Sequence, residues 1–287
     1  RDVTDATNMF CFNSNLTSLP AIVIKECPSL YAMFYKCTSL TNIDASNFNV
    51  SKTTDMENFV CHCPNLTSIN IEGWNTSNVV NMYNMFAYSE NLAEIIGLEN
   101  LNIEKVKTMI SIFDGCHSIK NLDLSNWNVE NATTILKIFR NCNTLETLDL
   151  SNWHLANCKN YSQALQGCDL LTNVIMKYGD YNTVNNIIEQ LPSKTAKAPG
   201  TLLINNVDSF EQVNTEAATA KYWNIEYKHE VTNFNKKIVN GEMLNKFAKK
   251  FNKKIQNKID IVDSKTEVID KAAIDEILLD VFGTTTE

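Results

Sequence analysis

The sequence predicts an α/β solenoid, a fold in which short, similar units stack one upon the next. Two observations lead to this prediction. An aromatic or apolar anchor recurs seven times between Arg1 and Met176, at a nearly constant interval, and a similar series of apolar residues follows it each time. A unit of this length cannot bury its own apolar face, so the units gain a continuous core only by stacking.

The anchors set the register of the units. A cysteine, serine or asparagine follows the anchor by three residues and a leucine or isoleucine by six, although both come one residue later in the third unit, at Cys63 and Leu66. Three residues further on, an alternating pair such as Leu122 and Leu124 predicts a short strand with one buried face. The seven anchors are Phe10, Phe34, Phe59, Phe86, Phe113, Phe139 and Leu165.

The remainder of each unit is expected to contain a turn and a helix. Ser125–Asn128 has turn composition, because asparagine tolerates unusual backbone angles and bonds to its own backbone. Asn131–Arg140 carries apolar residues at a helical spacing, as Ile135 and Phe139 illustrate, so we expect a short helix there. The tryptophans that close the turns are expected to pack beside the strands rather than to bind sugar. They are Trp74, Trp127 and Trp153.

The combined pattern M-x-x-M-F-x-x-C-x-x-L-x-x-L-x-L-S-N-W resembles the BspA-type leucine-rich repeat family of bacterial surface proteins. The resemblance covers about residues 1–176 and is clearest at Met82–Leu92 and Phe113–Trp127. It weakens at Ile95–Leu98, where the tryptophan is missing and the loop is longer. The resemblance implies a leucine-rich-repeat solenoid of about seven units that is presented outside a cell or virion for adhesion. It implies no catalytic residue.

Residues 177–227 break the period, and we assign them to a C-terminal cap that covers the exposed end of the core. Tyr181–Leu191 has the pattern of a helix that ends before Pro192, and Trp223 is expected to pack on the last unit. The other elements expected in the cap are a strand at Thr201–Ile204, a helix at Thr215–Ala220 and a strand at Tyr222–Tyr227.

Residues 228–287 form a third segment, in which we expect a helical tail for oligomerisation or attachment. Residues 228–262 hold nine lysines against three acids, whereas residues 263–287 hold two against seven. An apolar stripe at helical spacing indicates an amphipathic helix that needs a partner. Membrane-surface binding is the alternative that we weigh less. The stripe consists of Leu244, Phe247, Phe251, Ile255 and Ile259. Val239–Phe247 resembles terminal segments of bacteriophage tail and fibre proteins.

Several functional classes receive little support from the sequence. The net charge of −8 argues against a nucleic-acid-binding protein, and no apolar run approaches the ~18 residues of a membrane-spanning helix. The nine cysteines are expected to be reduced, buried residues of the repeats. Cys61-His62-Cys63 is not expected to bind metal, because adjacent residues of an extended chain point to opposite sides. We therefore expect no metal, no cofactor and no enzymatic activity.

Polar residues between the strand leucines are the candidate binding residues. Solenoids use such faces for recognition, although a merely solvated face is the simpler interpretation. The predicted face is one polar ladder that consists of Asp44, Asn70, Asp123 and Asp149. A glycosidase is the alternative from another class, and it would need two convergent carboxylates in a cleft.

These observations favour a non-enzymatic recognition protein at an exterior surface, with a host-cell receptor of protein or glycan as its partner. We expect a component of a bacteriophage virion, such as a fibre or baseplate protein, whose tail joins other copies or virion scaffold proteins. The alternative is a bacterial cell-surface adhesin of the BspA-type family. No direct membrane contact is expected.

Overall fold

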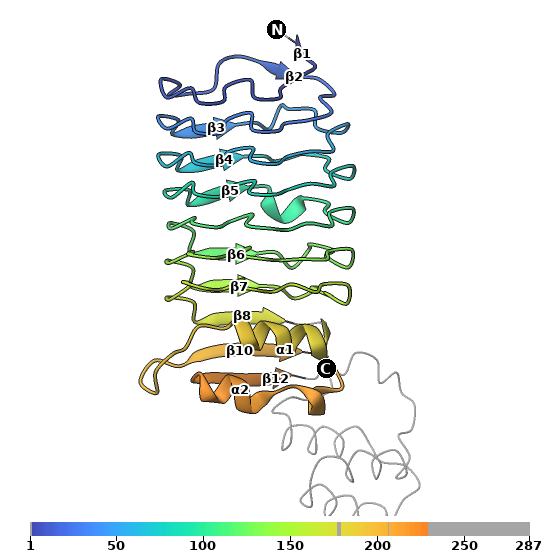
Figure 1. Ribbon diagram of the computed structural model, residues 1–287, viewed down its shortest axis with the longest axis vertical. Coiled ribbons are helices and arrows are strands. Elements are labelled where there is room, and N and C mark those ends of the chain that lie inside the picture. Colours follow the sequence, from blue (N-terminus) through green and yellow to red (C-terminus); the bar gives the residue numbers. More distant parts are fainter. Residues whose placement is uncertain (1, 177–178, 206, 229–287) are drawn as a thin grey trace, which may run out of the picture. The chain divides into compact units, whose positions relative to one another are not determined.

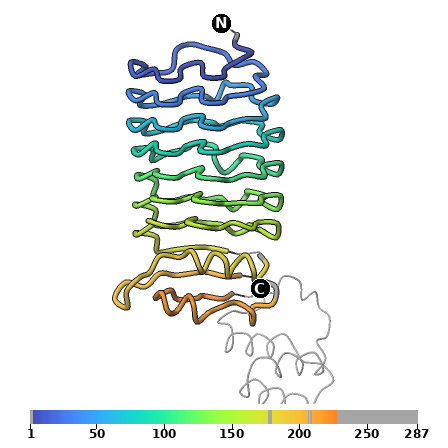
Figure 2. The backbone as a smooth tube through the Cα atoms, in the orientation of Figure 1, coloured from blue at the N-terminus to red at the C-terminus, as the bar shows by residue number. Residues whose placement is uncertain are grey.

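A computed structural model describes residues 2–176, 179–205 and 207–228. The chain divides into two units, Arg1–Glu226 and Tyr227–Glu287, and the first is described here. Its chain runs in successive turns that lie one beside the next, and we call each turn a coil (Figures 1 and 2). The architecture is mixed α/β with parallel sheets and few helices, which confirms the predicted class at this level.

Short strands occupy the same position in successive coils and pair in parallel (Figure 1). A three-stranded sheet consists of β3 (Asn42–Asp44), β4 (Ser68–Asn70) and β5 (Glu94–Ile96). A five-stranded sheet has the order β12-β10-β8-β7-β6, with bounds Asn121–Asp123 for β6, Thr147–Asp149 for β7, Asn173–Met176 for β8, Gly200–Asn205 for β10 and Trp223–Lys228 for β12. Two smaller pairs are β1 (Asp2–Val3) with β2 (Val23–Ile24) and β9 (Gly179–Asp180) with β11 (Val207–Asp208).

A second column of parallel bridges joins the coils on another side. It runs without interruption from the second coil to the last repeat. Many of its residues also cap their own turn, because the side-chain oxygen accepts a hydrogen bond from the amide two residues later, as from Glu57 to Asp55 at 3.0 Å. The column consists of Ser29, Asp55, Asn81, Thr108, Thr134 and Asn160.

The helix predicted within the repeat is absent, and the prediction for Asn131–Arg140 is wrong. Alternate amides of this segment bond to the next coil, as Lys137 does to Ser162 at 3.0 Å. The amides between them bond to the carbonyl three residues earlier, as Arg140 does to Lys137, and so close tight turns. A left-handed φ of 58° at Lys137 also prevents a continuous right-handed helix. Apolar residues three and four positions apart therefore belong to successive tight turns rather than to one helix.

The anchors form one column, which is buried from the second coil onward, with one correction to the predicted register. The amide of each anchor bonds to the carbonyl just before the next anchor, and Phe34 bonds in this way to the carbonyl of Phe59 at 2.9 Å. The third anchor is therefore Val60, and the assignment of Phe59 was wrong by one residue. Phe59 occupies the position of Met85, yet its buried ring still contacts the Phe34 ring, with centroids 5.5 Å apart. With Val60 in place, Cys63 and Leu66 have regular positions.

The cap has the predicted elements. α1 (Tyr181–Gln190) begins after Asp180, whose carboxylate accepts a hydrogen bond from the amide of Thr183 at 2.8 Å. α2 (Thr215–Ala220) has Asn214 as its N-cap. Trp223 lies against Gly200 of β10, where an added Cβ would come within 2.6 Å of the indole ring. Two short 3-10 helices are η1 (Leu98–Asn100) and η2 (Phe210–Gln212).

The predicted helical tail, with the stripe at Leu244, Phe247, Phe251, Ile255 and Ile259, lies outside the described residues. Among the described residues, no helix is long and apolar enough to cross a membrane.

Candidate functional site

The four predicted face residues occupy two separate sheets. Asp44 and Asn70 are Cα partners in the three-stranded sheet, and Asp123 and Asp149 are Cα partners in the five-stranded sheet. The corresponding residue of β5 is Ile96, which is 41% exposed. The structure thus brings the residues together as two polar pairs on either side of an apolar side chain rather than as one ladder.

Each of these polar side chains has a local structural role. The amide of Ser125 donates to Asp123 at 3.0 Å, and that of Ser151 donates to Asp149 at 2.9 Å. Asp44 accepts bonds from both the hydroxyl and the amide of Ser46, and the hydroxyl bond in particular lowers the pKa of Asp44. These bonds fix the turn after each strand. They also hold the carboxylates in a regular orientation at the end of the exposed sheet face.

The interruption between the two sheets arises from one extra residue. The step from Phe86 to Phe113 is one residue longer than the steps from Phe113 to Phe139 and on to Leu165. The tryptophan bonds locate the insertion, since Trp127 Nε1 donates to the carbonyl of Leu98 just as Trp153 Nε1 donates to that of Leu124. Leu98 is thus three residues after Ile95, whereas Leu124 is two residues after Leu122.

Gly97 absorbs the extra residue as a bulge. Its φ is +90°, in the left-handed region, and an added Cβ would lie 2.7 Å from the Cα of Glu72. β5 is consequently the last strand of one sheet and β6 the first of the next, so no strand ladder joins them in the described part of the chain. The bridge between Asn81 and Thr108 keeps the same two coils joined on another side.

A shallow groove of about 260 Å³ opens at this interruption. It has apolar residues from β5, η1 and β6 and polar residues beside them. The lining consists of Ala93, Ile95, Leu98, Glu99, Ile119, Asn121, Leu122 and Asp123. A second hollow of about 340 Å³ shares Glu99 and has a more polar lining of Asn100, Leu101, Asn102, Ile103, Glu104, Asn126 and Asn128. Of the predicted face residues, only Asp123 lines either hollow.

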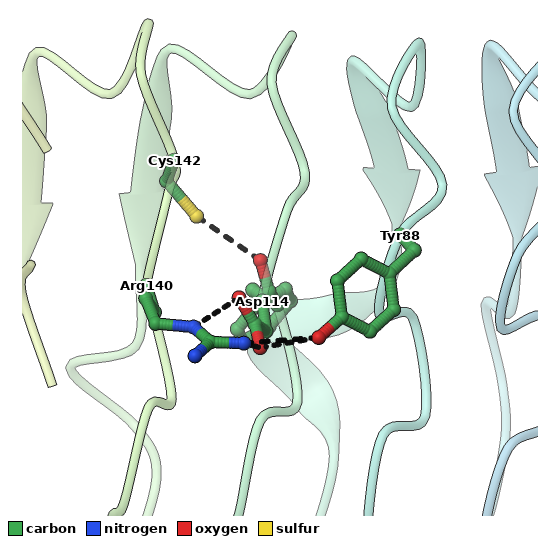
Figure 3. A network of polar contacts seen from close by, with 5 residues as sticks. Tyr88, Asp114, Arg140 and Cys142 are labelled. Carbon is green, nitrogen blue, oxygen red and sulfur yellow. Dashed lines mark hydrogen bonds and ion pairs between the residues drawn. The ribbon is translucent and has the colours of Figure 1, made fainter. Parts of the chain in front are cut away.

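A polar network around one buried carboxylate was not predicted. Asp114 is fully buried and accepts bonds from Arg140 Nε at 2.9 Å and from the hydroxyl of Tyr88 at 3.0 Å (Figure 3). The three side chains come from three successive coils. Burial raises the pKa of Tyr88, and so does its hydrogen bond to Asp114; the bond to Asp114 also raises the pKa of Arg140. The sequence signal was a charged residue pair, Asp114 and Arg140, separated by one repeat length of 26 residues.

The cysteines at the repeat position are structural. The thiol of Cys142 donates to the carbonyl of Phe113 at 3.1 Å, and Cys63 donates to Phe34 at 3.0 Å. Ser89 makes the equivalent bond to Val60. Burial raises the pKa of Cys37 to about 11 and that of Cys168 to about 12, which disfavours the nucleophilic thiolate. All nine cysteines are free thiols.

The Cys61-His62-Cys63 sequence does not converge on one point. Cys61 and Cys63 are buried, whereas His62 is half-buried and stacks on Tyr88 with ring centroids 4.5 Å apart. Among the described residues, no group of three or more His, Cys, Asp or Glu side chains could hold a metal ion. The predicted packing of Trp74, Trp127 and Trp153 in the core is confirmed, because all three are buried.

A protein-family model described as "Mycoplasma protein of unknown function, DUF285" matches residues 1–69 and 54–178. The chain belongs to the DUF285 family. This family is related to the BspA-like surface repeat proteins, which supports the resemblance of the repeats at that level. The DUF285 match ends at residue 178, and nothing in the comparisons supports the likeness of residues 239–247 to bacteriophage tail proteins. No curated protein and no solved structure matches the chain.

Proposed function

We propose that this DUF285 protein is a non-enzymatic recognition protein whose repeats form a leucine-rich-repeat solenoid at an exterior surface. The observation that carries the proposal is the open polar sheet face, interrupted by the groove between β5 and β6. The residues of such a face vary without disturbing the core, because strand side chains alternate between the buried and the exposed side. In this proposal Asp44, Asn70, Asp123 and Asp149 belong to the binding face.

A bacterial cell surface is the location that we favour. The support is the family relationship, since the DUF285 family is described as a Mycoplasma family and is related to surface repeat proteins. A bacteriophage virion is the second candidate, and its support is the resemblance of Val239–Phe247 in the sequence. In either location the tail, residues 228–287, would attach the protein or join it to other copies through the stripe from Leu244 to Ile259.

An enzymatic function is less consistent with the site. Asp123 and Asp149 repeat along an open face and each accepts a bond from its own turn, whereas a glycosidase holds two carboxylates across a bound sugar. The thiols of the repeat are buried beside backbone carbonyls, where their raised pKa values suit a structural role.

The location is tested by mass spectrometry of peptides from purified cell-surface fractions and purified virions. Peptides of this chain in the surface fraction would support the adhesin proposal. Detection only in virions would replace it with the virion proposal. Detection in neither fraction, with the protein confined to the cell interior, would reject exterior recognition altogether.

The binding face is tested by replacing Asp123 and Asp149 together with lysine. We expect attachment of the purified protein to host cells to fall by an order of magnitude or more, because two acceptors become cations on the same face. Unchanged attachment of this lysine variant would move the binding surface elsewhere.

A variant with Phe247 and Phe251 replaced by aspartate tests the tail, and we expect it to remain folded but to lose assembly in light scattering.

A further inference from the structure

One strand residue of the repeat core is left uncovered. The central residues of the other strands in this column are buried, with Ile43, Ile69 and Leu148 at most 2% exposed. Ile95 has the same position in β5 but is only half-buried, because no strand pairs with the far side of β5. Ile96 beside it is exposed. An apolar side chain that the stack covers elsewhere is therefore open to solvent at the groove.

The rim of the groove is acidic. Glu99 of η1 and Asp123 of β6 both line it, and Glu104 lines the neighbouring hollow that shares Glu99. No lysine or arginine of the described chain is among the residues that line the two hollows. The ion pair between Arg140 and Asp114 does not involve these carboxylates. The groove thus presents an apolar floor and two carboxylates along its edge, with no cationic side chain among its lining residues.

We propose that this groove binds a lysine or arginine side chain from an extended basic segment of a partner protein. Such side chains have an apolar stem and a cationic end, and they characteristically bury the stem while the charge remains near water or an acceptor. The stem would cover Ile95 and Leu98, and the cation would approach Glu99 and Asp123. A neutral glycan would use the same acceptors but would gain nothing from the net charge of the rim.

The acceptors are suitably held for this role. Asp123 is fixed by the bond from the amide of Ser125, and Glu99 accepts a bond from Asn100 Nδ2 at 3.0 Å. Carboxylates held in place lose less conformational entropy on binding than free ones. This inference rests on the proposed recognition function and names the chemistry of the partner at one part of the same face.

The experiment measures binding of two short peptides to the full chain by NMR titration, one of alternating lysine and threonine and the other of alternating glutamine and threonine. We expect the lysine peptide to bind and to shift the amide resonances of Ile95, Leu98 and Asn121. The glutamine peptide is expected to bind at least about tenfold more weakly. The double variant Glu99→Gln, Asp123→Asn should bind the lysine peptide at least about tenfold more weakly, because both carboxylates are lost. Both replacements retain the shape of the side chain, and the introduced asparagine can still accept the hydrogen bond from the amide of Ser125.

A matched control separates the groove from the general negative charge of the chain. Glu130→Gln with Glu146→Gln removes two exposed carboxylates outside both hollows and changes the net charge equally. We expect this control to bind the lysine peptide with unchanged affinity. Equal weakening by both double variants, equal affinity for both peptides, or no binding of the lysine peptide would each overturn the inference. If cell attachment persisted in those cases, the proposed recognition function would stand without this partner.

Discussion

Arg140 donates two hydrogen bonds to Asp114, a fully buried carboxylate in the preceding coil. The side chain of Arg140 retains 22% of its exposure. Arg140→Ala should therefore destabilise the protein by about 2–4 kcal/mol, somewhat less than a fully buried pair would lose. Urea unfolding followed by circular dichroism measures this. Arg140→Lys is the control, because it keeps the charge but loses the paired geometry, and it should recover only part of the loss. A loss below about 0.5 kcal/mol in Arg140→Ala would contradict the role given to the pair.

The repeat cysteines are expected to tolerate serine better than alanine. Cys142→Ser keeps a donor to the carbonyl of Phe113, and Ser89 already makes this bond in another coil. Cys142→Ala leaves that carbonyl unsatisfied in the core and should lower the free energy of unfolding by about 1–3 kcal/mol. Thermal melting of the two variants compares them directly. If serine proved as destabilising as alanine, packing of the sulfur rather than its hydrogen bond would be the main contribution.

Gly97 and Gly73 form a matched pair for the bulge. Both have a positive φ, but an added Cβ at Gly73 meets nothing within 4 Å, whereas one at Gly97 meets the backbone of Glu72. We expect Gly73→Ala to lower stability by about 1 kcal/mol through backbone strain alone. Gly97→Ala should lower it by about 2–4 kcal/mol, because strain and a backbone clash add. Equal effects in urea unfolding would mean that the backbone of Glu72 yields easily.

Deleting Gly97 should repair the interruption. The deletion restores the spacing of the later anchors and places Ile95 and Leu98 two residues apart, as Ile69 and Ile71 are in the preceding coil. We expect the stack to remain folded, β5 and β6 to pair and the groove to close. Hydrogen exchange should then slow at the amides of residues 119–123. Unchanged exchange there, in a protein that is otherwise folded, would show that the one-residue excess is not what separates the sheets.

His62 should make the stability fall in weak acid. Burial and the charge of Lys36 lower its pKa below the ordinary 6.5, with Glu90 acting in the opposite sense. The folded state therefore favours the neutral ring. The contribution of His62 to the free energy of unfolding is present above pH ~6.5 and declines at lower pH, as the unfolded state takes up a proton. His62→Phe keeps an aromatic ring between Tyr35 and Tyr88 without a titrating group. Its stability should change less than that of the wild type between pH ~7.5 and ~5. If the stability of both proteins changed equally with pH, groups other than His62 would be responsible.

The sequence predicted most of the core because core positions repeat. The tryptophans, the cysteine position and the elements of the cap followed from composition and spacing, and the structure confirms them. The register error at Phe59 arose because an aromatic residue preceded Val60 and was taken as the anchor. Cys63 and Leu66 were both displaced by one residue, and that joint displacement already located the error in the anchor rather than in the two later positions.

The predictions that were wrong concern features that depend on contacts between coils. Ile135 and Phe139 fit a helix, but their amides bond to the next coil, a possibility that spacing within one unit does not express. The polar face was predicted as one ladder, and the insertion at Gly97 divides it. The sequence shows the departure from the repeat at Ile95–Leu98. The separation of the two sheets that results from it becomes evident only in the structure of the backbone. The uncovered side of Ile95 becomes evident only when neighbouring strands are compared.

The column of anchor bonds also limits how this protein can change in length. The amide of Phe113 bonds to the carbonyl of Ile138, and that of Phe139 bonds to Ala164, so the junctions between successive coils are interchangeable. A copied stretch one full coil long would insert a unit whose bonds match those above and below it, and the loss of such a stretch would close up in the same way. Duplication and deletion of whole coils would alter the reach of the protein while both ends of the stack remain as they are.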